Sequence, residues 1–156
     1  MYNNNRNEGT NYEINGSKAL SNESINATAQ ADILCISIAT TGKDPLRDRI
    51  TSIATCALNQ YPILIDMTLS KPEDVITLKQ LLEDHTAKVF FDAQKALNFF
   101  HAAGFDINGP IYDVMLMDKI LQAGEKKKKM TIDDIIKEYL GATIDSAVNP
   151  VVKEAA

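Results

Sequence analysis

The 156-residue sequence lacks tryptophan and has only two cysteines, Cys35 and Cys56. Both lie in apolar stretches that are typical of core strands. Two thiols in a chain of this length do not indicate a disulfide framework, and no Cys/His cluster has the spacing of a zinc site. We expect two reduced cysteines, although pairing of their two strands would leave a disulfide open.

Positive charge is also scarce, because 16 Lys and Arg residues stand against 21 Asp and Glu residues and the formal net charge is −5. Strong nonspecific binding to nucleic acid usually needs a basic surface, so this balance argues against it but leaves room for a local basic groove. No apolar run approaches the roughly 20 residues of a membrane span, and no secretory signal opens the chain. We therefore expect a soluble, cytoplasmic protein without a membrane partner.

The first 30 residues are rich in Asn, Ser, Gly and Thr and hold few large apolar side chains. Such a segment buries too little apolar surface to offset the entropy lost on ordering, so residues 1–30 are predicted to be a disordered tail. Apolar patterning then begins abruptly. We predict one domain over residues 31–145 and a C-terminal tail over residues 146–156.

Three short apolar stretches separated by turn residues predict an antiparallel meander of strands. Their ranges are 32–39, 49–58 and 61–67. In the second stretch, the side chains expected to face the core are Ile50, Ile53, Ala54 and Cys56.

After residue 70 the apolar pattern follows a helical period. The elements predicted there are a helix over 72–84, a strand over 87–91, a helix over 93–103, a short extended piece near 111–113, and helices over 114–122 and 131–140. In the helix over 114–122, the side chains expected to face the core are Leu116, Met117, Ile120 and Leu121. Asp92 and Asp113 precede two of these helices, and we interpret each as an N-cap. This order of elements predicts an α/β domain with a mixed sheet.

The most informative motif is Ile36-Ser37-Ile38-Ala39-Thr40-Thr41-Gly42. It resembles the first motif of the 3′–5′ exonuclease domains of family-A DNA polymerases and of RNase D, whose strand ends Asp-x-Glu-Thr-(Thr/Glu)-Gly. Later segments resemble further motifs of the family in the same order, over residues 78–84, 87–96, 104–116 and 132–141. The resemblance implies a ribonuclease-H-like exonuclease fold, in which a three-strand antiparallel meander and short parallel strands form a mixed sheet flanked by helices.

The catalytic acids of that family are missing here. Its reaction uses four carboxylates that hold two Mg²⁺ or Mn²⁺ ions. By the resemblance, Ser37 and Ala39 stand at the first two ligand positions and Ala96 at the third, while the fourth ligand and its helix are absent after Gly141. Serine and alanine cannot replace charged oxygen ligands, so we expect no bound metal, no other cofactor and no intact catalytic residue.

The resemblance without the acids implies a pseudo-exonuclease that acts as a nucleic-acid-binding, protein-binding or scaffolding module. Three alternatives remain: a metal-dependent 3′–5′ exonuclease of DNA or RNA with full or residual activity, the exonuclease-like fragment of a DNA polymerase, and a decayed gene product without a selected role. Natural decay or gene truncation accounts for the missing helix, whereas engineered knock-out substitutions would match the two alanines but not Ser37.

The expected partners are single-stranded DNA or RNA, bound weakly, or a protein partner or second copy bound through the face left open by the missing helix. The lysine run over residues 126–129 is interpreted either as a solvated loop or as a patch that contacts phosphates. The candidate residues for nucleic-acid binding are Thr40, Thr41, Arg47, Arg49, Asp92, Lys126, Lys127, Lys128 and Lys129.

Overall fold

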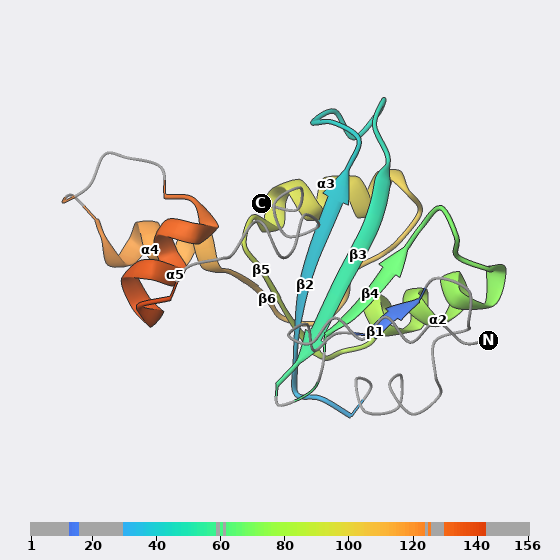
Figure 1. The fold of residues 1–156 in the computed structure, drawn as a ribbon, viewed down its shortest axis with the longest axis horizontal. Helices are drawn as coiled ribbons and strands as arrows, with labels where there is room; N and C mark the ends of the chain where they lie inside the picture. Colours follow the sequence, from blue (N-terminus) through green and yellow to red (C-terminus); the bar gives the residue numbers. More distant parts are fainter. Residues whose placement is uncertain are drawn as a thin grey trace, which may run out of the picture.

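The computed structural model describes residues 13–15, 30–58, 60, 62–123, 125 and 130–142, which build one sheet with helices beside it (Figure 1). The six strands are β1 Glu13–Asn15, β2 Ile33–Thr40, β3 Ile50–Ala57, β4 Ile63–Asp66, β5 Ala87–Phe90 and β6 Ile111–Asp113. The helices are α2 Pro72–Glu83, α3 Ala93–Ala102, α4 Val114–Leu121 and α5 Ile132–Leu140.

The sheet has the strand order β1-β4-β3-β2-β5-β6. Strands β2, β3 and β4 form the antiparallel meander, and β5 and β6 extend the sheet from β2 in parallel. The predicted mixed sheet is confirmed. The helix expected to be missing would follow Gly141, and residues 143–156 lie outside the described residues.

Strand β1 pairs in parallel with β4, with Glu13 opposite Ile63. These three residues fall in the segment that the sequence predicts to be disordered. The edge of β4 offers backbone donors and acceptors with which a short segment can pair. The rest of residues 1–29 lies outside the part of the chain that the structure describes.

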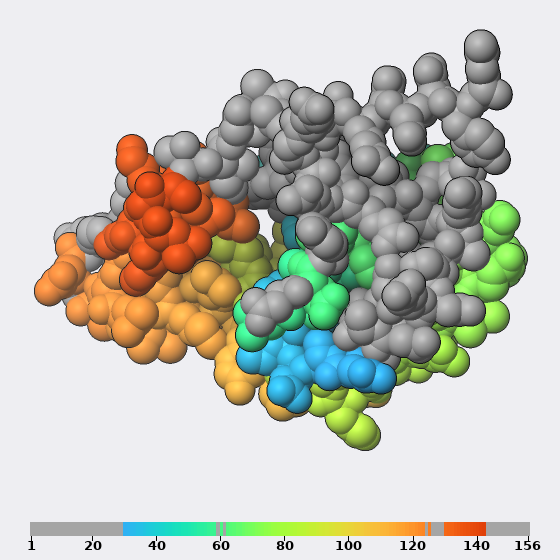
Figure 2. All heavy atoms as spheres, turned by 60° about the horizontal axis from the view of Figure 1, so that its bottom comes forward, coloured from blue at the N-terminus to red at the C-terminus, as the bar shows by residue number. Residues whose placement is uncertain are grey.

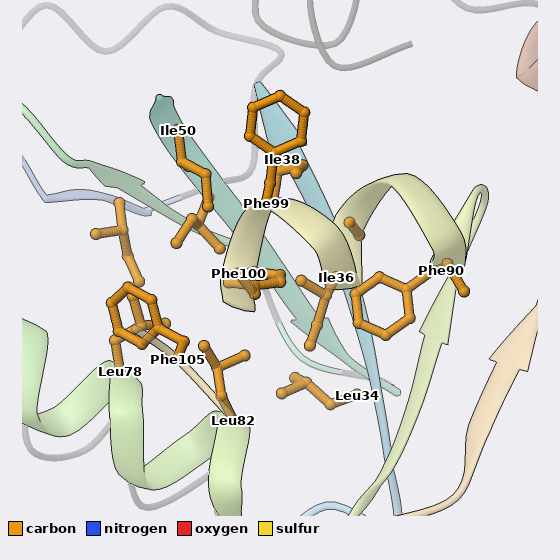
Figure 3. Packing of buried hydrophobic residues seen from close by; sticks show 14 of the residues in the cluster. Leu34, Ile36, Ile38, Ile50, Leu78, Leu82, Phe90, Phe99, Phe100 and Phe105 are labelled. Carbon is orange, nitrogen blue, oxygen red and sulfur yellow. The ribbon is translucent and has the colours of Figure 1, made fainter. Parts of the chain in front are cut away.

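One face of the sheet carries the hydrophobic core (Figure 3). Along β2, Leu34, Ile36 and Ile38 alternate with more exposed residues and belong to the core cluster, as the two-residue period of a strand requires. Helices α2 and α3 cover this face with apolar stripes at helical spacing. Phe100 of α3 is fully buried and meets Phe105 edge to face, with ring centroids 6.0 Å apart.

Strand β3 corrects one prediction about the core. Ile50 and Ile53 are buried as predicted, but Ala54 and Cys56 are only half-buried and line a groove on the opposite face. Because side chains alternate along a strand, Ile53 in the core directs Ala54 to the other side. Small apolar residues do not distinguish the two faces by their chemistry, which is why the sequence pattern misled.

Helix α4 corrects a second prediction. Four of its apolar side chains were expected in the core, yet Leu116, Met117, Ile120 and Leu121 are between 41% and 74% exposed. The helix begins where the edge strand β6 ends and lies with α5 to one side of the sheet (Figure 1). Helical periodicity found the apolar side chains but could not show that the core lies elsewhere. None of the helices described is long and apolar enough to cross a membrane.

Candidate functional site

A cavity of about 590 Å³ opens beside β2, the end of β5 and the start of α3. Its lining brings together Ser37 of β2 and Ala96 of α3, two of the three positions that the resemblance assigned to metal ligands. Ala39, the third position, does not line the cavity and is only 2% exposed.

Two carboxylates near the start of α3, Asp92 and Asp113, act as helix caps. Asp92 Oδ1 accepts the backbone N–H of Lys95 at 3.2 Å, so Asp92 caps α3. Asp113 caps α4 by accepting the N–H of Leu116 at 3.1 Å, and its other oxygen accepts the N–H of Ala93 at 2.9 Å. The N-cap interpretation is confirmed for both residues, and Asp113 in addition ties the starts of two helices together.

The donor atoms do not fit the two-ion centre that the resemblance implies. Ser37 offers a neutral hydroxyl, and Ala39 and Ala96 offer no side-chain oxygen. Hard divalent ions require charged oxygen ligands in number. Over the described ranges, no group of three or more His, Cys, Asp or Glu side chains is arranged to hold a metal ion. Metal-assisted hydrolysis therefore lacks ligands at these positions.

The turn between β2 and β3 uses the hydroxyls of both threonine candidates internally. Thr40 Oγ1 donates to the carbonyl of Gly42 at 2.7 Å. Thr41 Oγ1 donates to Asp48 Oδ1 and accepts the N–H of Arg49, both at 3.1 Å. A Cβ atom at position 42 would collide with the Asp48 carboxylate, so a larger residue there would displace this side chain and its hydrogen bonds. Thr40 and Thr41 thus shape the turn rather than presenting unused hydroxyl groups.

The same turn presents basic side chains to solvent. Arg47 lies 3.5 Å from Asp44 through its Nε, but its side chain is 87% exposed, and such a surface ion pair is weak. Arg49 and Lys43 are exposed as well. Lys43 also lines the cavity, together with the half-buried Lys95. The lysine run over residues 126–129 lies outside the described residues.

Lys43 and Lys95 were not among the residues selected from the sequence. Each stands next to a motif position, since Lys43 follows Gly42 and Lys95 precedes Ala96. A search for basic residues next to the motif positions would have found both. Only the structure shows that they line one cavity.

A second hollow, of about 680 Å³, is an apolar groove. Its floor is the sheet face opposite the core, and its wall is formed by α4 and α5, which Figure 2 shows in orange to red as a lobe at one side of the molecule. Ser37 and Phe91 line both hollows, so the cavity and the groove adjoin. The strands contribute Cys35, Ala54, Cys56 and Val89 to the floor, and the helices contribute Met117, Leu121, Ile136 and Leu140 to the wall.

One carboxylate, Asp118, lies in the described lining of this groove and is only 4% exposed. Its Oδ1 accepts hydrogen bonds from Gln122 Nε2 at 2.7 Å and from the Tyr139 hydroxyl at 3.1 Å. The second bond joins α4 to α5 and raises the pKa of Tyr139, because donation to a carboxylate favours the protonated phenol.

Comparison with solved structures finds the same fold in several other proteins. The POL domain of Pol1 from M. smegmatis, in complex with DNA primer-template and dNTP, superposes with a TM-score of 0.72 at 22% identity over 88% of this chain and 24% of that one. Escherichia coli RNase D, an exoribonuclease involved in structured RNA processing, gives 0.71 at 15% identity over 88% of this chain and 36% of that one. The Aedes aegypti Nibbler EXO domain gives 0.68 at 13% identity over 94% and 75%.

The chain thus spans about a quarter of the Pol1 structure and just over a third of the RNase D structure that it matches. No family model and no curated protein sequence matches it. At these identities, superposition establishes the arrangement of strands and helices. The chain therefore has the ribonuclease-H-like fold of 3′–5′ exonuclease domains.

Proposed function

We propose that this domain is a catalytically degenerate 3′–5′ exonuclease, a pseudo-exonuclease, that binds single-stranded DNA or RNA weakly without cleaving it. The observation that carries the proposal is the cavity between β2 and α3. By the resemblance, Ser37 and Ala96 in its lining stand at metal-ligand positions of the family, and neither offers a carboxylate that could hold a metal ion. A net charge of −5 limits the expected affinity to local contacts with the phosphate backbone.

The exposed cations of the β2–β3 turn are the strongest contact candidates from the sequence. Arg47 and Arg49 present their side chains to solvent beside the cavity residue Lys43. Thr40 and Thr41 support the turn, and Asp92 would repel a phosphate and is better explained by capping. The run Lys126, Lys127, Lys128 and Lys129 remains part of the proposal as a further phosphate-contacting patch.

The test follows the fluorescence anisotropy of labelled single-stranded DNA and RNA oligonucleotides over time, with Mn²⁺ present, at low and moderate salt. We expect a rise that salt weakens and that then stays constant. A rise followed by decay would mean cleavage, and a flat trace in both salts would mean that the domain does not bind these strands. The Arg47→Gln and Arg49→Gln variants should weaken binding equally for all sequences.

Residual exonuclease activity is the main competing hypothesis, whether in an independent enzyme or in a fragment of a DNA polymerase. It predicts metal-dependent cleavage that Asp92→Ala or Asp113→Ala abolishes in a folded protein. Because both carboxylates cap helices, each substitution should also cost about 1 kcal/mol of stability. Circular dichroism of each variant separates a lost cap from a lost ligand.

The apolar groove favours a second candidate function, the binding of a protein partner. Its described lining is apolar except for a few groups, among them the buried Asp118 carboxylate, which accepts two hydrogen bonds from neutral donors. A partner that matches this lining presents an apolar stripe and one cation. We therefore propose that the occupant is an amphipathic helix of another chain with a lysine or arginine opposite Asp118.

A leucine- and lysine-rich helical peptide serves as the probe, with a scrambled peptide as its control. We expect the helical peptide to bind more tightly and the Leu121→Glu variant to weaken it. Attraction by charge alone would instead strengthen with the added glutamate, which would contradict docking in the groove. Light scattering over a range of protein concentrations reports the other outcome, a homodimer formed through this face.

A further inference from the structure

The cavity at Ser37 carries more positive than negative charge. Lys43 lines it from the turn after β2, and Lys95 lines it from the first turn of α3. Asp92 is the one carboxylate in its described lining, and Asp92 Oδ1 already accepts the backbone N–H of Lys95. Where this fold would gather acids around metal ions, the chain presents two ammonium groups against one engaged carboxylate.

Neither lysine has an ion-pair partner within the described part of the chain. The cations that form ion pairs there are Arg47, Lys79 and Lys88. Lys43 is exposed and Lys95 is half-buried, so both can turn toward a ligand in the cavity. Two like charges that line one hollow repel each other, and an anion between them relieves that repulsion.

The shape and chemistry of the lining favour a phosphate group over a carboxylate side chain or a divalent cation. A lysine ammonium is a compact charge with three donors and is a common phosphate ligand in proteins. The hydroxyl of Ser37 adds a neutral donor, and it makes no side-chain hydrogen bond to another described residue. The buried residues Phe90 and Ala96 add apolar walls, beside which electrostatic interactions are stronger than in open water.

We propose that this cavity binds a phosphate group directly through Lys43 and Lys95, with the Ser37 hydroxyl as a further donor. In the family, carboxylates hold metal ions that in turn contact the phosphate. In this chain, lysine ammonium groups would contact the phosphate directly. The inference rests on the proposed function for its expected source, a phosphate of a single strand. A free phosphate ion has the same chemistry and would use the same groups.

The first arm of the test asks whether the site exists. The ¹⁵N-labelled full chain is titrated with inorganic phosphate at constant ionic strength, with chloride as the reference anion. We expect saturable shifts of the amide signals of Ser37, Lys95 and Ala96 that disappear in the Lys43→Met/Lys95→Met double variant. Lys79→Met is the matched control, because Lys79 lies on α2 and does not line the cavity.

Two results of this arm would overturn the proposal: no saturable shifts in the wild type, or the same shifts in the double variant. The spectrum of each variant reports whether it is folded. If the double variant unfolds, the single variants and the charge-retaining Lys95→Arg replace it. Arginine at position 95 should keep phosphate binding, whereas Lys95→Met should weaken it.

The second arm identifies the source of the phosphate and separates this inference from the proposed function. For a single strand, the plot of log K against log salt concentration has a negative slope. Its magnitude should decrease by about 0.7 for each lysine removed. If phosphate shifts the signals but oligonucleotides do not bind, the proposed function fails and the site serves free phosphate. If oligonucleotides bind and the double variant changes neither the salt slope nor the phosphate shifts, the proposed function holds and the lysine site is wrong.

Discussion

The two faces of the central sheet differ in how the chain covers them. On one face, α2 and α3 bury Leu78, Leu82, Phe99 and Phe100 against the strands, with exposures of 2% or less. On the other face, α4 and α5 lie to one side and leave a groove with Leu121 and Leu140 about three-quarters exposed. One face has the packing of a core and the other keeps apolar side chains exposed, although the same strands supply both.

The largest expected effect comes from removing a large side chain on the covered face. Phe100 is fully buried, so Phe100→Ala should lower the free energy of unfolding by about 3–5 kcal/mol through lost burial and the cavity left behind. Leu121→Ala on the open face should change it by no more than about 0.5 kcal/mol. Urea denaturation of both variants measures the contrast. Similar losses would mean that α4 is packed in solution.

A buried charge on the covered face should give the next largest effect. Lys88 of β5 is fully buried, and its Nζ donates to the carbonyl oxygen of Asp84 at 2.6 Å and to Asp84 Oδ1 at 2.7 Å. Asp84→Ala leaves this ammonium without its counter-charge and should cost about 3 kcal/mol. Glu83→Ala is the control, because it breaks an exposed pair with Lys79 and should cost less than about 1 kcal/mol. Equal costs would show that Lys88 finds another partner.

The same pair predicts how stability depends on pH. Burial raises the pKa of Asp84, but hydrogen bonds from Lys88 and Thr86 together outweigh it, so the pKa lies below its usual value. A lowered pKa in the folded state stabilises the protein above the unfolded pKa, near 3.9, and this contribution disappears as the pH falls through the folded pKa. In thermal melts between pH 7 and pH 2, the stability of Asp84→Asn should therefore decrease less on acidification than that of the wild type. An identical loss would contradict the assignment.

The smallest effect concerns the thiols on the open face, where Cys35 lies directly opposite Cys56 in the β2–β3 register. Burial raises the pKa of both thiols, and for Cys35 the neighbouring Cys56 adds to the rise. At pH 7.5 the reactive thiolate is scarcer than in glutathione, so iodoacetamide should modify both cysteines more slowly. Mass spectrometry of single Cys→Ser variants over pH 7 to 10 measures each rate. A rate at pH 7.5 equal to that of glutathione would show that the groove is more polar than its lining indicates.

Local chemistry made much of the fold predictable. The breaks at Gly42 and Pro45, the helix start at Pro72 and the caps Asp92 and Asp113 lie in the sequence itself, and the observed elements follow them closely. Strand β1 could not be predicted, because its stability comes from pairing with the distant β4. The candidate site was half predictable, since motif spacing located Ser37 and Ala96 but not the lysines beside them.

Apart from β1, the order and approximate boundaries of the strands and helices follow from the sequence, because turn residues, caps and apolar periods act over a few neighbouring positions. The absence of carboxylates at positions 37, 39 and 96 is likewise a property of the sequence. The tertiary structure alone decided which apolar stripes are buried, since Phe99 and Leu121 carry the same hydrophobic signal and only one meets the core. It also decided which charges share a cavity. Lys43 and Lys95 are 52 positions apart, and the register of β2 beside β5 brings their segments to one site.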